Sequence, residues 1–284
     1  MSSIRWVAIA AGFLFASLPL GFSHAEFDLP VLSKVEKTLS FSDEIDPQQV
    51  LRFIDVRDLT VEVRLHAGDA LPAMWHSVLM DKFRSVQKRI VMSQIPNERA
   101  IERLRKLERL EVVMELPCKS ADLADLNRLY ALGPVKKRIV LQDGCGSSAL
   151  QQATKLNFSE LGIVPRADGA LDRETLAQLI TDKTRRKYVY LPADATAEAL
   201  LDLAAIAPLA IQVKCVRNRI PDVLFGILKD MRHVDVFLEV DGRITLEDAR
   251  QWVALNRFAL LVRIDDPGAI TPGLANLLNG IAPP

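Results

Sequence analysis

Residues 187–216 read KYVYLPADATAEALLDLAAIAPLAIQVKCV, and this stretch contains the unit that organises most of the chain. A short apolar run comes first (187–191), a stretch with helical apolar spacing follows (196–207), and a second short run begins at Ala210. A strand–helix unit cannot bury its own apolar face, so neighbouring units are expected to stack on one shared core. The pattern predicts tandem βα units whose parallel strands are joined by right-handed crossovers.

The same unit recurs about every 24 residues from residue 88 onward. Eight apolar runs are recognised, and each is followed by a stretch with helical spacing. They begin at Arg89, Glu111, Arg138, Leu161, Lys187, Ala210, Val234 and Ala259. Threonines at 196 and 245 precede acidic residues, which is typical of helix N-termini.

The first residues of the chain have a different character. Arg5 is followed by an apolar stretch and then by Ser-His-Ala at 23–25. This order is typical of a cleaved secretory signal peptide over residues 1–25. A retained membrane anchor is the alternative, because the apolar stretch is nearly long enough to span a bilayer.

Residues 26–50 are polar and are expected to form a leader or linker. In residues 51–87, two strand-like runs separated by Arg57-Asp58 predict a hairpin, and an amphipathic stretch after them predicts a helix. Together with the eight βα units at 88–281, they are expected to form a single domain spanning 51–284.

Parallel strands in this number can close into a barrel or remain open as a curved array. One row of strand positions, expected to face away from the helices, is mostly apolar, and an open array would expose it to water. The row is Val91, Val113, Val140, Val189, Gln212, Phe237 and Leu261. We therefore expect an α/β fold that resembles the (βα)8 TIM barrel, with the hairpin and helix at its N-terminus.

Four units also carry the apolar spacing of a second architecture. The lines are Leu104-x-x-Leu107-x-x-Leu110-x-Val112, Leu203-x-x-Ile206-x-x-Leu209-x-Ile211, Leu228-x-x-Met231-x-x-Val234-x-Val236 and Trp252-x-x-Leu255-x-x-Phe258-x-Leu260. This spacing resembles that of leucine-rich repeats, although the expected asparagine is absent and Asp241 or Asp265 stands there in two units. The resemblance implies an open leucine-rich-repeat-like solenoid as the alternative fold.

The balance of charge bears on possible partners. The chain has 36 Lys and Arg against 36 Asp and Glu, which gives no long-range attraction to nucleic acid or anionic lipid. Basic runs at 136–138 and 183–187 precede strands and are interpreted as solvated loops.

We expect an exported protein of the periplasm or extracellular space, with a small molecule or an envelope protein as partner. Nucleic acid is not expected to bind, nor a membrane after signal cleavage.

Three cysteines follow the signal segment. Cys118 and Cys145 occupy the same position relative to the strand in consecutive units. The spacing of adjacent parallel strands is compatible with the Cα–Cα distance of a disulfide. Export to an oxidising compartment allows such a bond. The sequence predicts a Cys118–Cys145 disulfide with Cys215 free inside its strand, and three unpaired core cysteines are the alternative.

Polar residues gather at the C-terminal ends of the predicted strands, where barrel enzymes place catalysis. The row is Ser93, Glu115, Gln142, Leu191, Lys214, Glu239 and Arg263. Glu239 and Glu115 could serve as a carboxylate pair in glycoside or ester hydrolysis, and Lys214 beside Arg263 could act as base or nucleophile. The alternative is a charge network that satisfies itself, because buried charges must be paired.

Two functions therefore remain open, and the sequence does not decide whether the protein is an enzyme. Short loops after the strands favour a non-catalytic binding or scaffold protein of the cell envelope over a hydrolase. No pair of histidines has metal-ligand spacing, so neither a metal nor a cofactor is expected.

Overall fold

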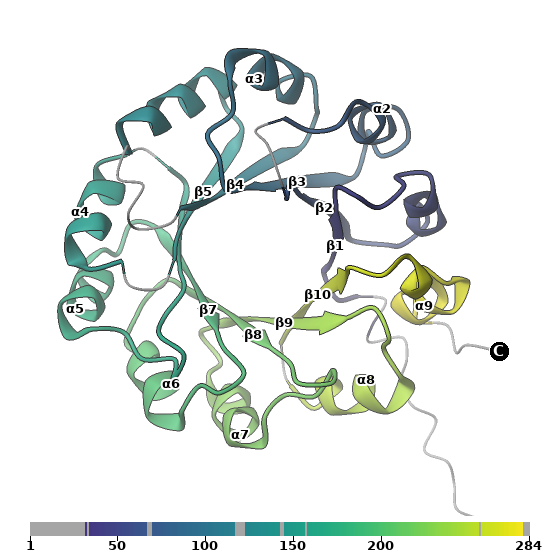
Figure 1. Cartoon of the computed structure of the whole chain (residues 1–284). Coiled ribbons are helices and arrows are strands. Elements are labelled where there is room, and N and C mark those ends of the chain that lie inside the picture. Colours follow the sequence, from purple (N-terminus) through teal and green to yellow (C-terminus); the bar gives the residue numbers. More distant parts are fainter. Residues whose placement is uncertain are drawn as a thin grey trace, which may run out of the picture.

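The computed structural model is a closed barrel of ten parallel strands surrounded by helices (Figure 1). The strands are β1 (Lys37–Ser42), β2 (Leu59–Arg64), β3 (Gln87–Met92), β4 (Leu110–Leu116), β5 (Lys136–Leu141), β6 (Glu160–Ile163), β7 (Arg186–Leu191), β8 (Leu209–Lys214), β9 (Asp235–Asp241) and β10 (Ala259–Ile264). The structure describes residue 32 and residues 34–66, 70–116, 123–142, 145–156, 158–255 and 257–280.

Helical segments connect the strands and cover the outside of the barrel (Figure 1). The α-helices are α2 (Ala73–Asp81), α3 (Glu98–Leu104), α4 (Ser147–Lys155), α5 (Arg173–Thr181), α6 (Ala197–Leu203), α7 (Asp222–Asp230), α8 (Leu246–Val253) and α9 (Pro272–Leu278). Short 3-10 helices are η1 (Gln49–Phe53), η2 (Leu123–Leu132) and η3 (Pro267–Ala269). Side-chain caps fix several helix starts, including both predicted threonines, and Thr245 forms a capping box with Asp248.

Strand β1 corrects the predicted organisation of the N-terminal part. Residues 37–42 lie in the segment expected to be a linker, yet they close the barrel. Leu39 pairs with Val61 of β2 on one side and with Val262 of β10 on the other. The barrel therefore has ten strands, and the eight-strand count was two too few. The predicted signal peptide at 1–25 lies outside the described residues.

The predicted hairpin is also wrong, because β2 pairs in parallel with both β1 and β3. The first strand-like run falls largely in η1, where Val50 and Phe53 are buried at a spacing of three residues. The closed α/β barrel of tandem βα units is confirmed, and the continuous ring of strand pairs contradicts the open solenoid.

Successive residues of each strand point alternately to the helices and to the barrel lumen. The outward residues form the main hydrophobic core. Val189 and Leu191 of β7 belong to this core, although the sequence analysis placed both on the inner row. Tyr188 and Tyr190 face the lumen instead. This strand is apolar on both faces, so its pattern did not fix the register, and a one-residue shift exchanges the faces.

Lysines near the start of alternate strands are buried. The interpretation of the basic runs as solvated loops is therefore wrong for these lysines. They are Lys37, Lys88, Lys137 and Lys187. The amine of Lys88 donates hydrogen bonds of 2.8–3.0 Å to the backbone carbonyls of Arg84, Val86 and Glu108. Because the carbonyls of the turns before β3 and β4 accept these bonds, a polar side chain can be buried at the strand start.

Candidate functional site

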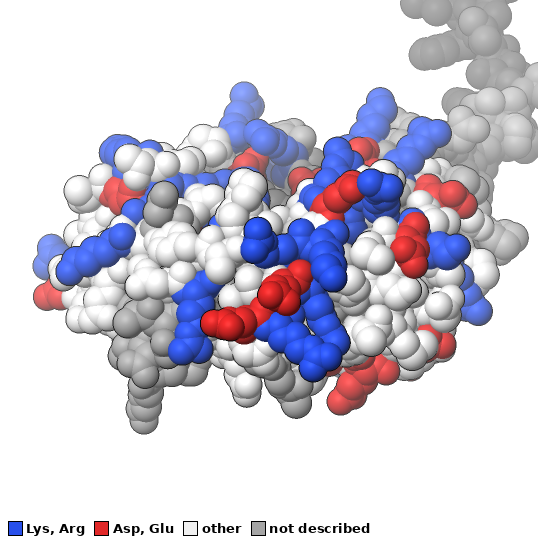
Figure 2. Space-filling model, turned by 90° about the horizontal axis from the view of Figure 1, so that it is seen from above, with Lys and Arg blue, Asp and Glu red and all other residues white. Residues whose placement is uncertain are grey.

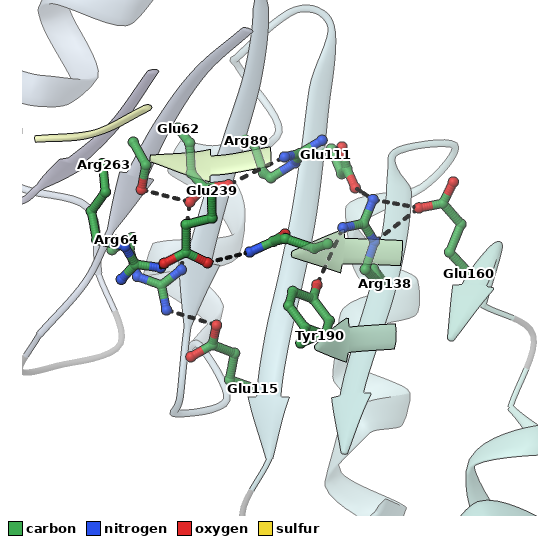
Figure 3. A network of polar contacts seen from close by, with 12 residues as sticks. Glu62, Arg64, Arg89, Glu111, Glu115, Arg138, Glu160, Tyr190, Glu239 and Arg263 are labelled. Atoms are coloured by element: carbon green, nitrogen blue, oxygen red, sulfur yellow. Dashed lines mark hydrogen bonds and ion pairs between the residues drawn. The ribbon is translucent and has the colours of Figure 1, made fainter. Parts of the chain in front are cut away.

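An alternating series of charges crosses the barrel lumen (Figure 3). The guanidinium of Arg89 lies between two carboxylates, 3.2 Å from Glu62 and 2.9 Å from Glu111. Arg138 continues the series, 2.9 Å from Glu111 and 2.7 Å from Glu160. These five side chains are buried, and we call them the lumen network.

Strand register brings the lumen network together. Its first three residues are direct neighbours on β2, β3 and β4, and its last two are neighbours on β5 and β6. Adjacent strands lie about 4.8 Å apart, so opposite charges at matching ranks can pair. On β1, the hydroxyl of Ser40 donates a 2.7 Å hydrogen bond to Glu62 and ends the series.

Electrostatics lower the pKa values of two carboxylates of the network, those of Glu111 and Glu62. Burial alone would raise the pKa of Glu111, but the charges of Arg89 and Arg138 outweigh it and lower this pKa to about 2. Burial would also raise the pKa of Glu62, but the charges of Arg89 and Arg64 outweigh it and hold this pKa below its ordinary value. The contact between Glu111 Oε1 and Arg138 is an ion pair without hydrogen-bond geometry.

Aromatic side chains of β7 complete the packing around Arg138. Its guanidinium carbon lies 3.5 Å from the ring centroid of Tyr188, and its Nη1 donates to the hydroxyl of Tyr190 at 3.3 Å. Gly162 on β6 makes room for this arrangement. A Cβ there would lie 2.8 Å from Val140 and 2.9 Å from Tyr190.

The residues predicted as a catalytic group lie at the C-terminal ends of the strands, which we call the mouth of the barrel. Glu239 is held through both carboxylate oxygens, Oε1 by Arg263 at 2.9 Å and Oε2 by Gln212 at 2.7 Å. Lys214 is the register neighbour of Glu239, but its side chain is exposed. The structure therefore brings together Glu239 and Arg263 as an ion pair.

The other predicted carboxylate, Glu115, pairs with a residue that the sequence analysis did not select. Its Oε1 lies 2.7 Å from Arg64, which comes from β2. Burial would lower the pKa of Arg64, but Glu115, Glu62 and Glu239 together raise it above its ordinary value. Arg64 thus links the mouth to the lumen network and lies within the electrostatic reach of Glu239.

Sequence reasoning missed Glu62, Arg64 and the rest of the lumen network. One signal was present, since Lys-Arg-Ile-Val occurs at 88–91 and again at 137–140. The repeat places an arginine at the same rank of β3 and β5. Charged residues at a strand start were interpreted as loop residues, and this hid the repeat.

The cysteines are only partly covered by the structure. Cys118 lies outside the described residues, so the Cys118–Cys145 bond remains a prediction. Cys215 is free and directly follows β8, rather than lying inside a strand. Burial raises the pKa of its thiol to about 12, which makes it a poor nucleophile at neutral pH.

The outer surface over α2 and α3 carries many Lys and Arg side chains with Asp and Glu between them (Figure 2). Arg84 and Glu108 form one such surface pair at 2.7 Å.

Within the described ranges, no group of three or more His, Cys, Asp and Glu residues could hold a metal ion. In the same ranges, every helix is too short or too polar to cross a membrane.

Comparison with known proteins gives no assignment, since neither a protein-family model nor a curated protein matches this chain. The mouth and the lumen network are therefore interpreted from their geometry and charge.

Proposed function

We propose that this protein is an exported, non-catalytic α/β barrel with a binding or scaffold role in the cell envelope. The observation that carries the proposal is the state of Glu239, whose two carboxylate oxygens are engaged by Arg263 and Gln212. A general acid, base or nucleophile needs an atom that can reach the substrate. Glu115 is likewise engaged by Arg64.

The space beneath the mouth supports the same proposal. Catalytic sites are usually concave pockets into which polar groups converge. Here the lumen network and the side chain of Tyr190 occupy the lumen below the mouth (Figure 3). The charges at the mouth then form the upper edge of a filled interior, where they stabilise the fold.

A substitution at Glu239 separates this role from hydrolysis. Under the proposal, Glu239→Gln removes the charge that compensates Arg263 and lowers the free energy of unfolding by about 1–3 kcal/mol. The matched control is Asp265→Asn, at an exposed loop residue just after β10, and its melting temperature should not change. The wild-type protein should not hydrolyse p-nitrophenyl esters or glycosides. If it hydrolyses them, and Glu239→Gln abolishes turnover without lowering the melting temperature, the hydrolase alternative is correct.

Export rests on the sequence pattern of residues 1–25, and an oxidising compartment would allow the proposed Cys118–Cys145 bond. Expression with the native N-terminus in a bacterium should give a periplasmic protein. Its measured mass should match a chain that begins at Glu26. After unfolding without reductant, iodoacetamide should modify only Cys215. Retention of the apolar segment would contradict cleavage of the signal peptide, a cytoplasmic location would contradict export, and modification of three cysteines would contradict the bond.

A further inference from the structure

A cavity of about 490 Å³ opens at the N-terminal end of the barrel, across the lumen from the mouth. Its walls come from the first residues of β7, β9 and β10 and from the chain just before β1. We call this cavity the basin, and the residues important to its chemistry are Lys34, Arg186, Asp235, Phe237, Arg257 and Ala259. None of them belongs to the mouth or to the lumen network.

The inward residues beside the basin differ from those of the lumen network. Long Arg and Glu side chains occupy the part bounded by β2 to β6, but the inward residues near the start of β8 and β10 are Ala210 and Ala259. These alanines cluster with Tyr188 and Phe237. A barrel widens as strands are added, and eight strands already give an interior that side chains just fill. Of these four residues, Phe237 and Ala259 line the basin, where the small side chain of Ala259 leaves room.

Two arginines are held at the edge of the basin by a single carboxylate. Arg186 lies 2.5 Å from Oδ2 of Asp235, and Arg257 lies 2.6 Å from Oδ1. The guanidinium of Arg186 is also placed over aromatic rings, 4.9 Å from the centroid of Tyr188 and 5.9 Å from that of Phe237. Each contact with Asp235 uses one Nη of a guanidinium that has five N–H donors, so donors remain on both arginines.

The charge around the basin favours an anion. Lys34, Arg186 and Arg257 supply three positive charges, whereas Asp235 and Glu36 supply two negative charges. Asp235 already has two cationic partners, so a ligand cation that binds to Asp235 would have to displace an arginine. A ligand anion can use the remaining donors without breaking either ion pair.

We propose that the basin binds a small organic anion, with its carboxylate on Arg186, Arg257 and Lys34 and its apolar body against Phe237 and Ala259. The arginines are positioned before the ligand arrives, because Asp235 and the aromatic rings already fix them, and this lowers the entropic cost of binding. The proposal concerns a different site from the mouth, and it does not depend on whether the mouth is catalytic.

The test uses three probes of one shape, namely benzoate, benzyl alcohol and benzylamine, titrated into the full-length protein by calorimetry at low salt. Benzoate should bind saturably with a Kd of about 1 mM or tighter, which fragments of its size can reach. The alcohol should bind about tenfold more weakly, because it lacks the charge-assisted hydrogen bonds, and the amine should not bind. Added salt should weaken the binding of benzoate.

Two variants locate the site. Arg257→Gln should weaken benzoate binding about tenfold, and Ala259→Leu should also weaken it by occupying the space beside Phe237. The matched control is Arg243→Gln, because Arg243 is equally exposed and also pairs with one aspartate, Asp266, but lies in the loop after β9. It should bind benzoate like the wild type. Absence of benzoate binding, tighter binding of benzylamine, or unchanged affinity in Arg257→Gln would overturn the proposal.

Discussion

Replacing Arg138 by methionine tests whether the lumen network stabilises the barrel. Methionine can occupy much of the space of the arginine side chain while removing its charge. In the variant, Glu111 would keep its ion pair with Arg89, and Glu160 would keep its ion pair with Lys136. Both carboxylates would remain buried, because methionine occupies the place of the arginine and their other neighbours on the adjacent strands do not change.

The magnitude follows from the contacts that are lost. Removing one member of a buried ion pair costs about 3–5 kcal/mol, since the remaining charge stays in a medium of low polarity. Losing the contact of the guanidinium with the Tyr188 ring adds about 1–2 kcal/mol. The partners that remain on the two glutamates offset part of this sum. We therefore expect Arg138→Met to lower the free energy of unfolding by about 4 kcal/mol, out of the roughly 5–15 kcal/mol of a typical domain.

Urea unfolding followed by far-UV circular dichroism at pH 7 measures this loss. The control is Arg219→Met, because Arg219 is 60 % exposed and pairs at 2.7 Å with the exposed Glu247. A surface pair contributes little, so the control should unfold close to the wild type. Adding Glu160→Gln to Arg138→Met should recover part of the loss by removing one uncompensated charge. A loss below about 1 kcal/mol in Arg138→Met, or an equal loss in the control, would refute a stabilising network.

Two further predictions concern pH and the inner surface of the barrel. The pKa of Glu111 is about 2 in the folded protein against an ordinary value of 4.5, so its contribution to stability is complete above pH 4.5 and is lost as the pH falls toward 2. The melting temperature, measured from pH 7 to pH 2, should therefore decrease once the pH is below 4.5. A melting temperature that does not change with pH would contradict the ion pairing. Gly162→Ala should destabilise the protein by about 1–3 kcal/mol, because its Cβ would lie 2.8 Å from Val140. Gly226→Ala in α7, where no atom lies within 4 Å, should stabilise it by up to about 1 kcal/mol, and equal effects of the two changes would contradict the close packing at 162.

The sequence predicted β3 to β10 because their outward residues are apolar and recur with the helices between them. It missed β1, whose inward residues Thr38, Ser40 and Ser42 are polar, so that the strand looks like a linker. It misread η1, since Val50 and Phe53 stand in a short apolar run that suits a strand as well as a 3-10 turn. In each case the tertiary environment decided between local patterns that were equally compatible with the residues.

The lumen network could not be predicted by the same reasoning, because it depends on pairing between strands. Arg89 and Arg138 follow lysines at strand starts, where charges usually lie in solvent. Their partners Glu111 and Glu160 belong to the next strands, so the compensation is visible only once the register is known. The sequence did place Glu239 and Arg263 together, because both lie near the ends of adjacent strands. It did not find Arg64, because β2 was assigned to a hairpin.

The number of strands connects the network, the mouth and the basin. A ten-stranded barrel is too wide for branched aliphatic side chains to fill, since eight strands already give an interior that side chains just fill. Arginine, glutamate and tyrosine are long enough to meet across the wider lumen, and alternating charges allow them to be buried there. On this argument, charge at the mouth does not by itself indicate catalysis, because a filled lumen must end in polar groups wherever it meets water. The ligand site that we propose lies instead at the opposite end of the barrel, where Phe237 and Ala259 line an open cavity.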